Sequence, residues 1–218
     1  MNHTPKSGRI RILLADDHSI FRAGLKKILA DQTDLCVTGE VDDGDQVLPT
    51  IKQGEWDLLL LDISMPGKSA LEIVTLCKKI RPDLPILILT MHRDQLMATR
   101  FIKAGARGYL TKDCGLDQLL LGMRKVAAGR RHMDPELADL IFEHMDGRIE
   151  SPPHALLSDR EYTVLCHIAS GLTVTRIAEK LSLSVSAISS YRLRLLNKLG
   201  FENNAQLTRY ALENNLLK

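Results

Sequence analysis

The stretch LLLLDISMP, residues 58–66, decides the fold of the first part of the chain. Four successive leucines are typical of a short strand that is buried on both faces, as in a parallel sheet covered by helices. Asp62 follows the leucines directly, and the chain then turns through Met65 and Pro66. An aspartate at this place is either a turn-forming residue or a carboxylate that is placed for chemistry.

Around this stretch, residues 9–130 alternate between short apolar runs and longer segments with helical spacing. The other apolar runs are IRILLA (10–15), LCVTGE (35–40), PILILT (85–90) and RGYL (107–110). Alternation of strands and helices predicts βαβ units, and therefore a parallel sheet with helices on both faces. We predict an α/β domain of the doubly wound type with a five-stranded parallel sheet.

The C-terminal part of the chain shows a different pattern. Residues 131–156 contain DPELADLIFEHM, which favours a short helix, and then the proline-bearing stretch DGRIESPPH, which favours a linker. From residue 157 onward no strand pattern remains, and helices are expected at 159–169, 173–181, 184–199 and 204–215. The predicted organisation is a domain at 9–130, a helical segment and linker at 131–156, and an all-α, four-helix domain at 157–218.

The composition excludes several classes of protein. A chain of 218 residues suits two domains, and 44% hydrophobic and 26% charged residues are typical of an ordered soluble protein. The four cysteines are scattered, so neither a zinc site nor a disulfide framework is predicted. No run approaches the ~20 apolar residues that span a bilayer, and the first residues lack the apolar core of a signal peptide. We expect a cytoplasmic protein with reduced thiols and no membrane association.

Polar side chains stand at the ends of four of the predicted strands. Asp16 and Asp17 follow the first strand, Asp62 follows the third, Thr90 ends the fourth and Lys112 follows the fifth. The carboxyl ends of parallel strands lie along one edge, where ligands bind. Three carboxylates repel each other unless a cation joins them, and Mg²⁺ suits such oxygen ligands. A carboxylate beside Mg²⁺ and a lysine can attack phosphorus, and Asp62, on the central strand, is the expected nucleophile.

The motifs LLADDH, LLLLDISMP, ILILTMH and AGARGYLTKD resemble the receiver domain of bacterial two-component response regulators, which has a flavodoxin-like fold. The resemblance covers residues 9–130. It implies that Asp62 is the phosphoacceptor for a partner histidine kinase. It also implies that Asp16, Asp17 and the backbone carbonyl of Ser64 bind Mg²⁺ together with Asp62.

The same resemblance assigns roles further along the strand ends. Thr90 and Lys112 are expected to contact the phosphoryl group, and Tyr109 is expected to reorient with Thr90. Separately from the resemblance, Ser64 and His92, which stand two residues after Asp62 and Thr90, are expected to affect the lifetime of the phosphate, by an amount that the sequence does not predict. Ala70 stands where relatives often have glycine, but it lies in the loop after the phosphoacceptor and away from the chemical groups.

The segment TVTRIAEKLSLSVSAISSYRLRLLNKLG, residues 173–200, predicts a helix, a short turn and a second helix of the kind that enters the DNA major groove. On a helical wheel the packed side contains Val185, Ile188, Leu195, Leu196 and Leu199. The opposite side contains Ser186, Ser189, Ser190, Leu193, Arg194 and Asn197. Residues 184–200 carry three basic residues and no acid. These residues alone equally allow a four-helix interaction module with an ordinary polar surface.

The stretches LSDREYTVLCHIASG, TVTRIAEKLSLS and NKLGFENNAQLTRYAL resemble the LuxR-type helix-turn-helix of the NarL/FixJ class of regulators. Contacts with base edges are expected from Ser189, Ser190 and Leu193. Contacts with phosphates are expected from Thr175, Ser186, Arg194 and Lys198. Ser189 and Tyr191 stand where relatives usually carry lysine and histidine, and this departure concerns the base preference and not the fold.

The sequence therefore predicts a phosphorylation-controlled, DNA-binding transcription regulator, and not an enzyme. Its expected cofactor is Mg²⁺, and its expected partners are a histidine kinase, double-stranded DNA and a second copy of the chain. Two alternatives stay open. In one, the receiver is a dimerisation scaffold that ignores phosphate, although the complete pocket argues against it. In the other, the chain is a hydrolase or phosphotransferase with an aspartyl-phosphate intermediate, although no insertion resembles a substrate cap.

Overall fold

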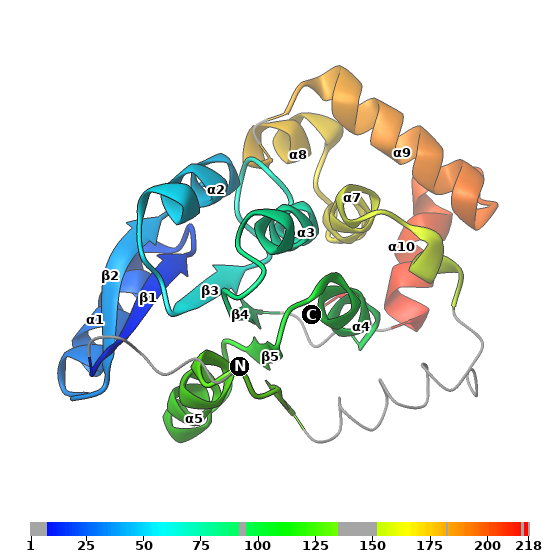
Figure 1. Cartoon of the computed structure of the whole chain (residues 1–218). Coiled ribbons are helices and arrows are strands. Elements are labelled where there is room, and N and C mark those ends of the chain that lie inside the picture. Colours follow the sequence, from blue (N-terminus) through cyan, green and yellow to red (C-terminus); the bar gives the residue numbers. More distant parts are fainter. Residues whose placement is uncertain (1–7, 92–94, 135–151, 182, 215, 218) are drawn as a thin grey trace. The chain divides into compact units, whose positions relative to one another are not determined.

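The computed structural model describes residues 8–91, 95–134, 152–181, 183–214 and 216–217 (Figure 1). The chain divides into two compact units, Met1–Glu143 and His144–Lys218. The helix predicted within 131–156 and most of the predicted linker lie outside the described residues, as does His92.

The first unit is built on one parallel sheet. Its strands are β1 (Ile10–Ala15), β2 (Leu35–Val41), β3 (Leu58–Asp62), β4 (Ile86–Thr90), β5 (Gly108–Thr111) and β6 (His132–Met133). Their order is β2-β1-β3-β4-β5-β6, and every neighbouring pair is parallel. The predicted doubly wound α/β fold is confirmed. The strand order reverses direction between β1 and β3, which is the place where such sheets bind ligands.

The prediction of five strands was wrong by one edge strand. β6 has two residues, and it pairs with Gly108 and Tyr109 of β5. The backbone N–H of His132 also donates to the carbonyl of Arg107 at 3.0 Å. Two residues are too few to show the alternation by which a strand is recognised in a sequence, so this element could not be predicted.

Within the described part of this unit, five helices cover the sheet: α1 (Ser19–Ala30), α2 (Gly44–Gln53), α3 (Ala70–Ile80), α4 (Gln95–Ala104) and α5 (Leu116–Ala127). α1 and α5 lie on one face, and α2, α3 and α4 lie on the other (Figure 1). Leu58 and Leu60 belong to a hydrophobic cluster with residues of α1 and α5. Leu59 and Leu61 point to the opposite face because side chains alternate along a strand. All four leucines are 0% exposed, which confirms that β3 is buried on both faces.

The second unit is helical. It contains a short 3-10 helix, η1 (Pro153–Leu156), and the helices α7 (Asp159–Ala169), α8 (Val174–Lys180), α9 (Val185–Leu199) and α10 (Asn204–Glu213). No strand occurs among residues 152–181, 183–214 and 216–217. The four predicted helices are therefore present, and α8 and α9 form the helix-turn-helix pair.

Side-chain caps define where these helices begin. The N-cap residues Ser158, Thr173, Ser184 and Asn203 each accept a hydrogen bond from the backbone N–H three residues later. Such caps satisfy N–H groups that have no partner inside the helix. α9 ends at Gly200, whose φ of +69° belongs to the left-handed region that favours glycine.

Replacing a leucine of β3 tests how much the buried strand contributes to stability. Leu60→Ala leaves a cavity in the core of the first unit and should lower its free energy of unfolding by about 2–5 kcal/mol. The matched control Leu121→Ala changes a leucine of α5 that is 46% exposed, and it should alter stability by about 0.5 kcal/mol or less. Trp56 is the only tryptophan of the chain and lies in this unit, so its fluorescence during urea unfolding reports on this unit alone. Equal losses in both variants would contradict the prediction.

Candidate functional site

The carboxylates predicted to meet at the edge of the sheet do lie together. Asp16 and Asp17 follow β1, and Asp62 is the last residue of β3, the neighbouring strand. Asp16 and Asp62 are 1% and 2% exposed, whereas Asp17 lies at the surface. The pocket therefore combines two buried acids with one that is open to solvent.

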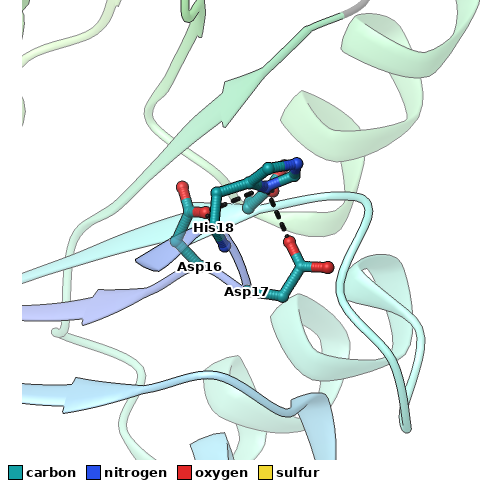
Figure 2. A group of neighbouring side chains, drawn as sticks. Asp16, Asp17 and His18 are labelled. Atoms are coloured by element: carbon teal, nitrogen blue, oxygen red, sulfur yellow. Dashed lines mark hydrogen bonds and ion pairs between the residues drawn. The ribbon is translucent and has the colours of Figure 1, made fainter. Parts of the chain in front are cut away.

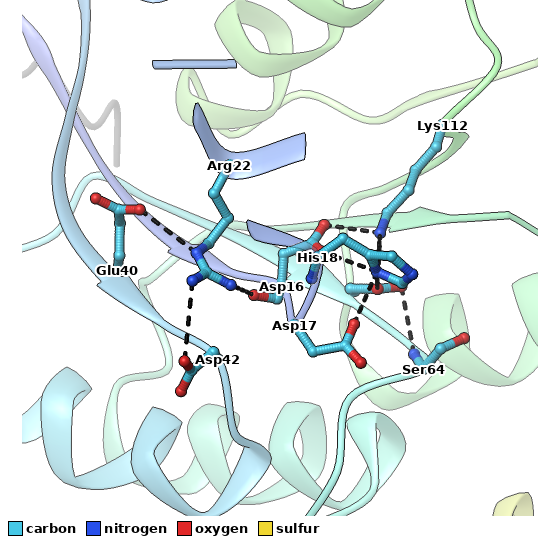
Figure 3. Close-up of polar contacts among 9 residues, drawn as sticks. Asp16, Asp17, His18, Arg22, Glu40, Asp42, Ser64 and Lys112 are labelled. Carbon is cyan, nitrogen blue, oxygen red and sulfur yellow. Dashed lines mark hydrogen bonds and ion pairs between the residues drawn. The ribbon is translucent and has the colours of Figure 1, made fainter. Parts of the chain in front are cut away.

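Lys112 joins the two buried carboxylates. Its Nζ lies 2.7 Å from Asp16 Oδ2 and 2.7 Å from Asp62 Oδ2 (Figure 3). The side chain is only 5% exposed, and the ammonium also lies 4.9 Å from the centre of the Phe21 ring. The backbone N–H of Lys112 donates to the carbonyl of Thr90 at 2.7 Å, which holds this residue at the ends of β4 and β5.

The loop after Asp62 turns back over the phosphoacceptor candidate. The backbone N–H of Ser64 donates to Asp62 Oδ1 at 3.3 Å. The carbonyl of Pro66 accepts a hydrogen bond from Gly44 N–H at 2.8 Å, and Gly67 takes a left-handed φ of +77°. These contacts hold the backbone of Ser64 beside the carboxylate. The role of its carbonyl as a metal ligand stays a prediction.

Thr90 and Tyr109 lie on the two adjacent strands β4 and β5. Thr90 is fully buried at the end of its strand, where it pairs with Thr111. The ring of Tyr109 is 1% exposed and packs against Phe101 of α4, with 6.3 Å between the ring centres. The tyrosine is therefore in an inward position and connects β5 to α4.

Two residues near the pocket were missed by sequence reasoning. The Nδ1 atom of His18 lies 2.8 Å from Asp17 Oδ1 and 3.3 Å from Asp16 Oδ1 (Figure 2). Arg22 of α1 donates to the backbone carbonyl of Asp16 and pairs with Glu40 at 3.5 Å (Figure 3). The signal for His18 was its place directly after the Asp16-Asp17 pair. The direction of its ring depends on the local backbone, which the sequence pattern does not show.

The charges in the pocket favour a cation. Burial raises the pKa of Asp62 above its ordinary value, although the ammonium of Lys112 opposes this effect. One lysine faces three carboxylates, so negative charge is in excess. One ligand atom from each of Asp16, Asp17, His18 and Asp62 lies within 4.8 Å of the others. Carboxylate oxygens at these distances are a suitable donor set for a divalent ion such as Mg²⁺.

In the second unit, the outer face of α9 is as predicted from the helical wheel. Its exposed residues include Ser186, Ser189, Ser190, Leu193, Arg194, Asn197 and Lys198, and Thr175 of α8 is exposed as well. Ile188, Leu195 and Leu196 are buried. Val185 was wrongly assigned to the packed side, since it is 48% exposed. It is the first residue of α9, and side chains there point back beyond the start of the helix.

Several of these polar groups bond within α9. The hydroxyl of Ser189 donates to the carbonyl of Val185, and that of Ser190 donates to the carbonyl of Ser186, each at 2.9 Å. The guanidinium of Arg194 lies 4.8 Å from the centre of the Tyr191 ring. The serine hydroxyls are thus satisfied locally, and they can rotate when a stronger partner approaches.

Lys198 has a different environment from the one expected. Its Nζ lies 2.7 Å from Oε2 of Glu161, a carboxylate that is 2% exposed and that also accepts a hydrogen bond from Ser158 N–H. Burial would raise the pKa of Glu161, but the bonds from Lys198 and Ser158 outweigh it and lower the pKa overall. Lys198 therefore stabilises the start of α7. Arg192, on the same helix, donates to Asn204 Oδ1 at 2.6 Å.

Among the described residues, no helix is long and apolar enough to cross a membrane.

Comparison with known proteins gives matches to both halves of the chain. The model of the response regulator receiver domain matches residues 12–124, and that of the bacterial regulatory proteins of the luxR family matches residues 155–211. The response regulator GacA of Pseudomonas viridiflava is 32% identical over 209 residues, which cover 95% of this chain and 98% of the relative. The response regulator UvrY of Escherichia coli is 32% identical over 208 residues, or 95% of each chain.

A solved structure of RcsB from Salmonella enterica serovar Typhimurium, bound to promoter rprA in the presence of the phosphomimetic BeF3-, is also similar. Its TM-score is 0.62 at 27% sequence identity, and the match covers 93% of this chain and 98% of that one. The similarity extends over both units.

Replacing Asp62 by asparagine tests the electrostatic strain in the pocket. The pKa of this carboxyl is higher in the folded state than in the unfolded state. The stability that Asp62 contributes is therefore fully present below its unfolded pKa of about 3.9. It is lost as the pH rises through the folded pKa, because ionising the buried carboxyl destabilises the folded state. Asp62→Asn should therefore raise the stability of the first unit, relative to wild type, more at pH 7 than at pH 4. Urea unfolding followed by Trp56 fluorescence, with divalent ions chelated, measures this difference. The control Asp42→Asn changes an acid that is 58% exposed and should show a smaller pH dependence. A gap between Asp62→Asn and wild type that does not change with pH would contradict the prediction.

Proposed function

Because this chain belongs to the bacterial response regulators, with a receiver domain followed by a LuxR-family regulatory domain, we propose that it is a phosphorylation-controlled transcription regulator. In this proposal Asp62 accepts a phosphoryl group from a histidine kinase, and the chain binds promoter DNA as a dimer. The observation that carries the proposal is the position of Asp62, buried at the end of the central strand and 2.7 Å from Lys112.

The phosphoryl transfer follows from the residues of the pocket. The Asp62 carboxylate attacks phosphorus, an O–P bond forms, and the bond between phosphorus and the kinase histidine breaks. Asp16, Asp17, Asp62 and the Ser64 carbonyl are the proposed ligands of Mg²⁺, which when bound neutralises charge on the phosphoryl oxygens. The Lys112 ammonium is already beside Asp62 and is the proposed partner of one of these oxygens.

The switch uses the added charge, roughly −1.5 to −2 at neutral pH. We propose that the Thr90 hydroxyl moves toward the phosphoryl group and that Tyr109 changes its packing against Phe101. Phosphorylation then favours one of two pre-existing arrangements of the surface around β4, α4 and β5.

The proposed DNA-binding surface is the exposed face of α9 with the start of α8. Ser189, Ser190 and Leu193 are the proposed contacts with base edges. Thr175, Ser186 and Arg194 are the proposed contacts with phosphates. Lys198 is left out because its ammonium is bound to buried Glu161. Three small or apolar contacts discriminate bases weakly, so two copies on a two-fold site are needed for specific binding.

The remaining assignments follow the same proposal. Residues 9–130 form the receiver, 131–156 connect the domains, and 157–218 bind DNA. The partners are a histidine kinase, double-stranded DNA and a second copy of the chain, and the place of action is the cytoplasm. The chain acts as a switch and not as an enzyme that turns over a metabolite.

The test of this function is a binding selection from random duplex DNA, with and without acetyl phosphate and Mg²⁺. An inverted-repeat motif should be enriched only with the phosphodonor, and Asp62→Asn should remove the effect of the donor. The same motif in both arms would instead favour a receiver that ignores phosphate. Turnover of a phosphorylated metabolite beyond slow self-dephosphorylation would favour the hydrolase or phosphotransferase alternative.

The different environments of Arg194 and Lys198 give a second test on the selected DNA. Arg194→Ala should weaken binding and reduce the slope of log affinity against log salt by about 0.9, because one phosphate contact is lost. Lys198→Ala should leave this slope unchanged but lower the thermal stability of the second unit, because Glu161 is left buried without its cation. Fluorescence anisotropy in a salt series and circular dichroism measure the two quantities. A reduced slope for Lys198→Ala would contradict the assignment of this residue.

A further inference from the structure

His18 is the N-cap residue of α1, yet its side chain makes no capping hydrogen bond. Its backbone N–H donates to Asp16 Oδ1 at 2.8 Å, which fixes the backbone at the end of β1. The imidazole turns away from the helix N-terminus and directs Nδ1 at the carboxylates of the pocket (Figure 2). Helix capping therefore does not explain the position of the His18 side chain, which faces three carboxylates.

The distances around Nδ1 resemble the edges of a coordination polyhedron. Nδ1 lies 2.8 Å from Asp17 Oδ1, 3.3 Å from Asp16 Oδ1 and 3.7 Å from Asp62 Oδ2. Two adjacent ligands of an octahedral ion with bonds of ~2.1 Å lie ~3.0 Å apart. A single ion can therefore be reached by the imidazole nitrogen and by these carboxylates after small side-chain movements.

We propose that His18 Nδ1 is a direct metal ligand, so that the pocket binds divalent transition-metal ions through nitrogen and oxygen. Imidazole is a common ligand of zinc, nickel, iron and copper, whereas Mg²⁺ is bound mainly through oxygen. His18 therefore increases the affinity for a transition metal much more than the affinity for Mg²⁺. This inference rests on the metal site of the proposed function and adds one ligand to it.

Lys112 is compatible with this arrangement. Its Nζ lies 3.5 Å from His18 Nδ1 and 2.7 Å from both Asp16 Oδ2 and Asp62 Oδ2. A metal-bound imidazole is neutral, so His18 adds no charge beside the ammonium, and the three carboxylates balance the charges of the ion and of Lys112. The His18 side chain is 57% exposed, and the metal would keep positions open toward solvent for water and for a phosphoryl oxygen.

A hydrogen bond to Asp17 alone would also bring Nδ1 close to this carboxylate, and the nitrogen would then lie outside the coordination sphere. The variant His18→Asn separates these explanations, because asparagine is a favourable N-cap residue and preserves the start of α1. Asp17→Asn is the matched control, since it removes an oxygen ligand and should weaken the binding of every divalent ion.

The experiment uses the full chain without a phosphodonor. Calorimetric titrations with Co²⁺ and with Mg²⁺ give both affinities for wild type, His18→Asn and Asp17→Asn. His18→Asn should lower the Co²⁺ affinity by about tenfold or more and change the Mg²⁺ affinity by about threefold or less, because an imidazole nitrogen favours transition-metal ions over Mg²⁺. In Mn²⁺-loaded wild type, electron spin-echo spectra should show coupling to a histidine nitrogen, and this coupling should be absent in His18→Asn.

Each alternative result of these titrations and spectra would overturn a specific part of the proposal. Binding of both ions without nitrogen coupling, and with equal losses for Co²⁺ and Mg²⁺ in His18→Asn, overturns the ligand role of His18 and leaves the metal site intact. Nitrogen coupling that persists in His18→Asn overturns it as well, because another histidine then binds the ion. If wild type binds neither ion, the metal site of the proposed function fails together with this inference.

Discussion

The pairing of Lys112 with two buried carboxylates is the interaction on which the receiver site depends. Asp16 directly follows β1 and Asp62 ends the neighbouring strand β3. Two ionised acids so close together at the carboxyl ends of the strands would repel each other and resist burial. Lys112, which directly follows β5, lies 2.7 Å from both carboxylates and keeps them together. It neutralises only part of the charge, because Asp17 adds a third carboxylate. The pocket is therefore stable enough to fold and still has an excess of negative charge that attracts a divalent cation.

A second buried carboxylate, Glu161, differs from the proposed phosphoacceptor Asp62 in the way that its charge is balanced. Glu161 is also held by a lysine at 2.7 Å, and it accepts a hydrogen bond from the backbone of Ser158. It has one cation for one charge, and its pKa is lowered. Asp62 shares its cation with Asp16, and burial raises its pKa. Burial is the main cause of the raised pKa of Asp62, and the neighbouring Asp16 adds to it, whereas at Glu161 the bonds from Lys198 and Ser158 outweigh burial and lower the pKa. The excess of acids around Lys112 is the feature of the pocket that favours a divalent cation.

Sequence reasoning predicted those parts of the structure that depend on periodicity and strand topology. The leucines of β3 predicted a doubly covered strand, and topology then required the residues at the strand ends to meet, as Asp16, Asp62 and Lys112 do. The parts it missed depend on single side-chain orientations or on very short elements. His18 turns into the pocket, Lys198 turns toward Glu161, and β6 has only two residues. A basic residue on a helix looks the same in the sequence whether it faces DNA or a buried acid.

The backbone at the ends of β4 and β5 links the pocket to a more distant surface. Lys112 donates its backbone N–H to Thr90, so the two residues proposed to contact the phosphoryl group belong to one hydrogen-bonded edge. Tyr109 lies on β5, three residues before Lys112, and its ring packs on Phe101 of α4. If the Lys112 ammonium leaves Asp16 for a phosphoryl oxygen, the residues at the ends of β4 and β5 would move first, because the interior of the sheet is close-packed and deforms little. The proposed change in the packing of Tyr109 on Phe101 of α4 would then carry the change of charge in the pocket to the surface.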